Sequence, residues 1–226
     1  MMTKEKYKKI ETDFYEKFWK NLKGRFSFDK THFSSEVPDP KIFDFIKILK
    51  KKRVAGKVLD IGCGNSRNAV ALAKSRFKLF GIEISSEAIK LSKMNGKLNK
   101  VKIDLKEGDF LEKNYKKNEF EVCIDSGLFH HLRKYQWQEY LNILNNILRP
   151  GGYFYLKVFS VDSGKLHKFT PPIGRRWLKK NNHVSRLFDV QEIESIFGQD
   201  FEIIKIMKTS KGETPLRFLV FFMRKK

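Results

Sequence analysis

Residues 57–73 constrain the fold most, because they join a buried strand, a glycine turn and a helix in one short stretch. The apolar run at 58–61 predicts a strand that is buried on both faces. Gly62 and Gly64 follow at once, and apolar residues at helical spacing come after them. Such a unit lets a ligand touch bare backbone at the carboxyl end of a parallel sheet. A dinucleotide-binding G-x-G-x-x-G pattern is excluded, because Arg67 stands where the third glycine is needed.

The pattern that remains at 60–66, Asp-x-Gly-x-Gly-x-Ser, resembles motif I of the class I S-adenosylmethionine-dependent methyltransferases. A second match is the Leu-Arg-Pro-Gly-Gly sequence at 148–152, which lies between an apolar helix and an apolar strand. The resemblance extends over nearly the whole chain from about Pro40 onward. It implies that S-adenosyl-L-methionine is the cofactor and that the glycine turn approaches the methionine and ribose portions of that cofactor.

Strand and helix signals alternate along the chain and predict a three-layer α/β fold. Parallel strands are expected at 58–61, 78–84, 101–105, 120–125 and 153–159, followed by an antiparallel pair at 201–207 and 216–223. Helices are expected at 4–22, from Pro40, from a cap at Ser85 or Ser86 to Met94, at 135–148 and at 190–197. The resemblance implies a Rossmann-like methyltransferase fold with a mostly parallel seven-stranded sheet and a C-terminal antiparallel hairpin. Residues 1–226 are expected to form a single domain.

Acidic residues stand at the expected ends of three neighbouring strands. Glu83 lies 23 positions beyond Asp60, the offset at which a carboxylate can accept hydrogen bonds from both ribose hydroxyls of an adenosine. The resemblance implies that Asp109 binds the exocyclic amine of adenine and that Phe110 packs on the adenine ring. The residues expected to bind the cofactor are Asp60, Gly62, Cys63, Gly64, Ser66, Asn68, Glu83, Ile84, Asp109, Phe110, Asp125, Ser126 and Phe129.

The loop after the fourth strand is expected to project toward the sulfonium group. Asp125 and Ser126 would border the methyl-transfer site, and the Phe129 ring could lie near the cation. The adjacent residues His130 and His131 cannot point the same way on an extended loop, so we expect one of them to face the cofactor or the acceptor. If the acceptor must lose a proton, one of these two histidines is the candidate general base.

The acceptor class follows from motifs that are present and absent. The Asp-x-x-x-x-His-His pattern at 125–131 resembles that of small-molecule methyltransferases. The chain lacks the Asp/Asn-Pro-Pro-aromatic sequence that marks methylation of nucleobase amino groups, and it lacks the paired glutamates of protein arginine methyltransferases. We therefore expect a small acceptor.

The segment 163–188 is expected to be a basic insert on the acceptor side. It holds seven basic residues and no acid between Asp162 and Asp189, so the acceptor is expected to be anionic. Basic residues interleaved with aromatic ones also suit RNA, which leaves an RNA- or ribosome-directed methyltransferase as an alternative. A module that binds the cofactor without catalysis is a further alternative.

Aromatic and apolar residues recur every three or four positions between Tyr7 and Leu22 and predict an amphipathic helix. Residues 1–38 are interpreted as a helical extension that either folds over the cofactor as a lid or simply docks on the core.

The formal charge of +21 fits a lysine-rich solvated surface and a polyanion-binding surface equally well. No apolar run approaches the ~18 residues of a membrane span. Two cysteines are too few for a metal cluster, so no metal site is expected. A cytoplasmic protein is expected, and its oligomeric state is left open.

Overall fold

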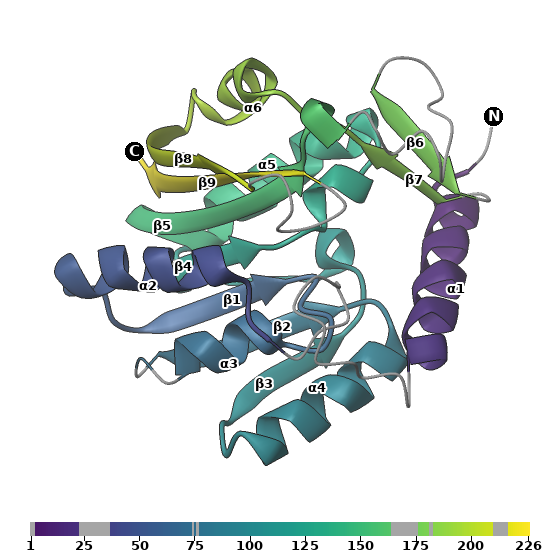
Figure 1. The fold of residues 1–226 in the computed structure, drawn as a ribbon, viewed down its shortest axis with the longest axis horizontal. Helices are drawn as coiled ribbons and strands as arrows, with labels where there is room; N and C mark the ends of the chain where they lie inside the picture. The colour runs from purple at the N-terminus through teal and green to yellow at the C-terminus, as the bar shows by residue number, and fades with distance from the viewer. Residues whose placement is uncertain are drawn as a thin grey trace.

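The computed structural model describes residues 3–22, 37–73, 75, 77–163, 176–180, 183–209 and 217–226, with only the backbone at 179 and 180. The described residues form a seven-stranded sheet in the order β3-β2-β1-β4-β5-β9-β8 (Figure 1). Its strands are β1 Lys57–Ile61, β2 Lys78–Glu83, β3 Ile103–Glu107, β4 Phe120–Asp125, β5 Leu148–Phe159, β8 Phe201–Lys208 and β9 Phe218–Lys225. Strands β1 to β5 run parallel, whereas β9 pairs antiparallel with β5 and β8 antiparallel with β9. The predicted α/β fold with a terminal antiparallel hairpin is confirmed.

The described helices are α1 Lys4–Leu22, α2 Pro40–Lys51, α3 Arg67–Ala73, α4 Ser86–Leu98, α5 Trp137–Ile147 and α6 Val190–Phe197. Three short 3₁₀ turns are η1 Phe110–Glu112, η2 Phe129–His131 and η3 Lys134–Gln136. The Ser85 hydroxyl accepts the N–H of Ala88 at 3.2 Å and caps α4, which decides between the two candidate serines. Asp189 caps α6 in the same way, as its side chain accepts the N–H of Glu192.

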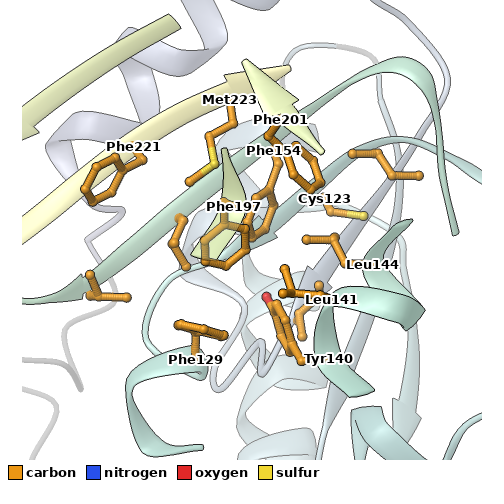
Figure 2. Close-up of a cluster of buried hydrophobic side chains, with 14 of the residues drawn as sticks. Cys123, Phe129, Tyr140, Leu141, Leu144, Phe154, Phe197, Phe201, Phe221 and Met223 are labelled. Carbon is orange, nitrogen blue, oxygen red and sulfur yellow. The ribbon is translucent and has the colours of Figure 1, made fainter. Parts of the chain in front are cut away.

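The core lies on both faces of the sheet, because the residues of β1 alternate between two clusters. Val58 packs with α2 and α3 on one face. Leu59 and Ile61 pack with α5 and α6 on the other, where aromatic side chains fill much of the space (Figure 2). The prediction of a strand buried on both faces is therefore confirmed.

Several boundaries differ from the sequence-based expectations. Helix α4 continues to Leu98 instead of ending at Met94, and the helix expected at 135–148 spans Trp137–Ile147. Three strand boundaries differ as well. The third strand begins at Ile103 instead of Val101, because the Val101 N–H still donates to the Gly96 carbonyl at the end of α4. Strand β5 begins at Leu148, since Pro150 offers no N–H to continue the helix. The second hairpin strand begins at Phe218 instead of Leu216, and the expected turn at Gly212 and Pro215 lies outside the described residues.

A second, two-stranded sheet lies within the basic segment, where no strand was predicted. Strands β6 Trp177–Lys180 and β7 His183–Arg186 pair antiparallel. Figure 1 shows this sheet and α1 beside the carboxyl ends of the parallel strands. None of the helices in the described part of the chain is long and apolar enough to cross a membrane.

Candidate active site

A cavity of about 490 Å³ lies at the carboxyl ends of the parallel strands. Its walls come from the loops after β1 to β4, from α1 and from the β6–β7 sheet. It brings together most of the residues that the sequence singled out: Asp60, Gly62, Cys63, Gly64, Asn68, Glu83, Ile84, Asp109, Phe110, Ser126, His130 and His131. Segments far apart in the sequence therefore meet at one site.

The glycine turn after β1 has the close approach that its composition predicts. Gly62 and Gly64 have φ angles of +66° and +53°, a backbone region that side chains rarely adopt. A Cβ atom on Gly64 would lie 2.7 Å from the Trp19 ring of α1. Ser66 also has a positive φ, and its hydroxyl hydrogen-bonds to Ser92. Ser66, which was expected to contact the cofactor, does not line the cavity, and its hydroxyl ties the glycine turn to α4 instead.

The Glu83 carboxylate fixes the glycine turn. Its Oε2 atom accepts the N–H of Gly64 at 3.0 Å, and its Oε1 atom accepts the N–H of Ser85 at 3.0 Å. Burial raises the pKa of Glu83, although these backbone N–H groups act in the opposite direction. Because each carboxylate oxygen has two lone pairs, Glu83 retains acceptor capacity toward the cavity that it lines.

Two more carboxyl groups face the same cavity. Burial, followed by the nearby Asp125 and Glu83 carboxylates, raises the pKa of Asp60. Asp109 accepts the N–H of Leu111 at 2.9 Å, and burial raises its pKa as well. Acids that are costly to ionise in a shared cavity favour a ligand that carries positive charge.

Asp125 differs from its predicted role. Its carboxylate accepts hydrogen bonds from the N–H groups of Gly127, Leu128 and Phe129 at 3.0, 2.7 and 3.0 Å, and from the Tyr140 hydroxyl at 2.8 Å. The side chain is fully buried and does not line the cavity. Burial raises its pKa to about 6. Asp125 therefore shapes the loop after β4 instead of contacting a ligand.

Phe129 also points away from the cavity. Its ring is fully buried, with its centroid 5.1 Å from that of Tyr140 and 5.1 Å from that of Phe197 (Figure 2). The reason is that η2 replaces the extended loop expected here, so the Phe129 side chain turns into the core. The predicted approach of this ring to a sulfonium is not supported.

Both histidines of η2 line the cavity, because the 3₁₀ turn does not alternate its side chains as an extended loop would. The rings of His130 and His131 lie 4.1 Å apart between centroids. The His130 Nδ1 atom is buried and has no hydrogen-bond partner among the described residues. Burial and neighbouring histidines lower both pKa values, that of His131 to about 3. Both imidazoles are therefore neutral at neutral pH.

Comparisons with known proteins agree with this geometry. The Methyltransferase domain family matches residues 58–152. The solved structure of a Burkholderia thailandensis 1,6-didemethyltoxoflavin-N1-methyltransferase has the same fold, with a TM-score of 0.73, 18% identity and coverage of 100% of this chain and 92% of that one. An uncharacterised methyltransferase of Schizosaccharomyces pombe is 31% identical over 146 residues, which cover 61% of this chain and 96% of the relative. This chain belongs to the class I S-adenosylmethionine-dependent methyltransferases.

A further relative of this methyltransferase shares more of the chain at lower identity. A tRNA N(3)-methylcytidine methyltransferase of Schizosaccharomyces pombe is 23% identical over 212 residues, which cover 85% of this chain and 64% of that protein.

The methyltransferase has a wall of its cavity that the sequence motifs do not mark. The Glu11 Oε2 atom of α1 lies 2.6 Å from His183 Nδ1 of β7. The Phe14 ring stacks on the His183 ring at 4.0 Å between centroids. The His131 Nδ1 atom lies 3.0 Å from the Ser185 hydroxyl. Glu11 lies on the apolar face of the predicted helix, and this placement of an acid was the one sign in the sequence that pointed to this wall. Nothing local in the sequence marked His183 or Ser185 as residues of the site.

The basic segment of the methyltransferase is neutralised in part by acids from outside it. Arg176 pairs with Asp189 at 2.7 Å and with Glu192 at 2.9 Å. Arg186 also pairs with Glu192. Residues 164–175 lie outside the described part, as do residues 23–36 of the N-terminal extension.

Arg67, whose presence in place of a glycine excluded a dinucleotide-binding motif, lines the cavity. No group of three or more His, Cys, Asp or Glu side chains within the described residues could hold a metal ion.

Proposed function

We propose that this methyltransferase binds S-adenosyl-L-methionine across the carboxyl ends of β1, β2 and β3 and methylates a small acceptor beneath α1. One observation carries the proposal. Asp60, Glu83 and Asp109, from three neighbouring strand ends, line a single cavity together with the glycine turn. The sheet order β3-β2-β1 makes the ends of these three strands neighbours.

The residues present fit the cofactor. Asp60 and the glycine turn suit its amino-acid end, Glu83 its ribose hydroxyls, and Asp109 with Phe110 its adenine. Burial raises the pKa of all three acids, so a cationic ligand would gain by lying among them. When bound, S-adenosyl-L-methionine supplies an electrophilic methyl group on a positively charged sulfur.

The protein contributes orientation and exclusion of water, which together account for ~7–11 kcal/mol in favourable reactions. The Ser126 hydroxyl and His130 Nδ1 are buried in the cavity wall without partners among the described residues. Such groups are costly unless a ligand or water satisfies them, which supports a polar ligand beside the loop after β4.

A small acceptor is supported by the way α1 covers the cavity. Trp19 is only 7% exposed and lies against Gly64, while Phe14 of α1 packs on His183 of β7. An acceptor next to the η2 histidines must therefore fit between α1 and β7. The expected negative charge of the acceptor gains no support from Arg176 and Arg186, because both are paired with acids. It stays a prediction that depends on residues 164–175.

RNA-directed methylation is the second candidate. The formal charge of +21 and the similarity to a tRNA methyltransferase over 85% of this chain favour it. RNA binding through phosphate contacts would weaken steeply as salt rises.

The test combines binding with turnover. S-adenosylhomocysteine is titrated by calorimetry, and methyl-labelled S-adenosyl-L-methionine is then incubated with the small-molecule and RNA fractions of a cell extract. We expect micromolar binding and label in the small-molecule fraction. Label in RNA alone, with steep salt dependence, would establish the second candidate. Absence of binding would refute the cofactor site, and binding without label in either fraction would favour a non-catalytic module.

A further inference from the structure

We propose that Glu11 of α1 takes the proton from the methyl acceptor, and that the acceptor is a small planar molecule with an O–H or N–H group directed at Glu11 Oε1. This inference rests on the proposed function and names the acceptor class and the base for that same site.

The two oxygens of the Glu11 carboxylate have different surroundings. Oε2 is held at 2.6 Å by His183 Nδ1. Oε1 is buried and has no hydrogen-bond partner among the described residues, although Glu11 lines the cavity. One oxygen thus fixes the side chain, and the other offers lone pairs to a ligand. A donor from the acceptor is the group that would satisfy it.

The η2 histidines, His130 and His131, are weaker proton acceptors than Glu11. Burial and neighbouring histidines lower the pKa of His131 to about 3, so its imidazolium would give the proton up at neutral pH. Burial raises the pKa of Glu11 to about 7, against the opposing effects of His131 and Arg133. A base whose pKa lies near the working pH is the better choice for general base catalysis. The candidate general base therefore moves from η2 to α1.

Groups from every surrounding element act on this carboxylate. They are His183 of β7, His131 of η2, Arg133 after η2, Tyr135 of η3 and Tyr15 of α1 itself. His131 and Arg133 favour the ionised form of Glu11, whereas burial disfavours it. The position of Glu11 on α1 means that the base is present only when this helix covers the cavity.

The shape of the acceptor follows from the aromatic walls around Glu11. Tyr7, Phe14, Tyr15 and Phe18 of α1 line the cavity, and Phe159 lies across it with its ring 3.9 Å from that of His130. Flat aromatic surfaces bind planar ligands by stacking and by burying apolar area. At Glu11 Oε1 a ligand meets an unpartnered carboxylate oxygen beside neutral η2 imidazoles, which favours a hydrogen-bond donor at that point.

The chemical step balances with these groups alone. The acceptor oxygen or nitrogen forms a bond to the methyl carbon as the carbon–sulfur bond breaks, and that electron pair remains on sulfur as S-adenosylhomocysteine. The proton of the acceptor passes to Glu11 Oε1 and is returned to solvent before the next turnover. No oxidant or further reactant is required.

The test measures binding of simple probes to the protein saturated with S-adenosylhomocysteine. Ligand-observed NMR titrations compare phenol with anisole and indole with 1-methylindole, with benzoate as the anion. At pH 8 we expect each donor to bind about tenfold more tightly than its methylated partner, the size of one hydrogen bond to a charged group. This preference should disappear at pH 5.5 and in Glu11→Gln. It should persist in Asp13→Asn, which removes the same charge from an exposed position of α1.

Unchanged affinity of Glu11→Gln for S-adenosylhomocysteine would show that the variant is folded, and the pH dependence of the unmodified protein provides a second measurement that needs no variant. The inference is overturned if benzoate binds more tightly than phenol, if the donor preference survives in Glu11→Gln, or if none of the probes binds. Failure of S-adenosylhomocysteine to bind would instead refute the proposed function.

Discussion

The two ends of the cavity are built by different means. At the strand ends, carboxylates are fixed by backbone N–H groups close in sequence, as Glu83 is by Gly64 and Ser85. Beneath α1, side chains hold one another across most of the chain, as Glu11 and His183 do over 172 positions. The first kind of site is encoded locally and can be recognised from spacing, whereas the second exists only once the fold has formed.

The chemistry of the two ends differs as well. The strand-end side holds several acids whose pKa values are raised by burial, which suits a cation. The α1 side combines aromatic rings and the neutral η2 imidazoles with the Glu11 carboxylate. Variants at one end should therefore change cofactor binding, and variants at the other should change acceptor binding.

The largest effect, on stability, should come from Asp125→Ala, which disrupts the loop after β4 between the two ends of the cavity. The change leaves three backbone N–H groups and the Tyr140 hydroxyl without their buried acceptor. We expect a loss of about 3–5 kcal/mol in the free energy of unfolding by urea denaturation. Tyr140→Phe removes only one donor and should cost about 1 kcal/mol. Equal effects of the two variants would contradict the role assigned to Asp125.

Glu83→Ala should affect only the strand-end side of the cavity, so it should weaken cofactor binding and leave acceptor binding unchanged. It removes the acceptor expected for the ribose and leaves the N–H groups of Gly64 and Ser85 without their acceptor. We expect affinity for S-adenosylhomocysteine to fall about 100-fold, or about 3 kcal/mol, by calorimetry. Glu107→Ala is the matched control, because Glu107 is the register neighbour of Glu83 on β3 and is exposed. A similar loss in both variants would argue against a ribose contact.

The same contrast explains what could be predicted from the sequence. The strand ends and the positions of Asp60, Glu83 and Asp109 followed from periodicity and spacing. The roles of Asp125 and Phe129 did not, because an acid and an aromatic residue after a strand look alike whether they face a ligand or the core. Only the turn into η2 and the packing against Tyr140 decide the matter.

The β6–β7 sheet was missed for a related reason. Its strands are four residues each, and the basic residues within them hide any alternation. The acids that pair with Arg176 and Arg186 lie after the basic segment 163–188. Counting the charged residues within that segment alone therefore overstated its unpaired positive charge.

Gly64→Ala tests the point where the two ends meet. The positive φ of Gly64 disfavours a side chain by about 1 kcal/mol, and the new methyl would collide with Trp19. We expect α1 to be displaced and affinity for S-adenosylhomocysteine to fall about tenfold. Adding Trp19→Ala should recover the part of the loss that comes from the collision. No coupling between the two changes would mean that α1 does not lie on the glycine turn when ligand binds.

Glu11→Gln tests the α1 end of the cavity through the pH dependence of stability. The pKa of Glu11 is raised from 4.5 to about 7, so the folded chain binds this proton more tightly than the unfolded chain does. The folded state of the unmodified protein is therefore progressively destabilised as pH rises from 4.5 to 7, and the glutamine variant escapes this penalty. At pH 8 the variant should be more stable by about 1–3 kcal/mol, and the difference should vanish near pH 4. Urea titrations at both pH values, with Asp13→Asn as the control, measure it. A difference that does not change with pH would place the Glu11 carboxylate in solvent and restore η2 as the source of the base.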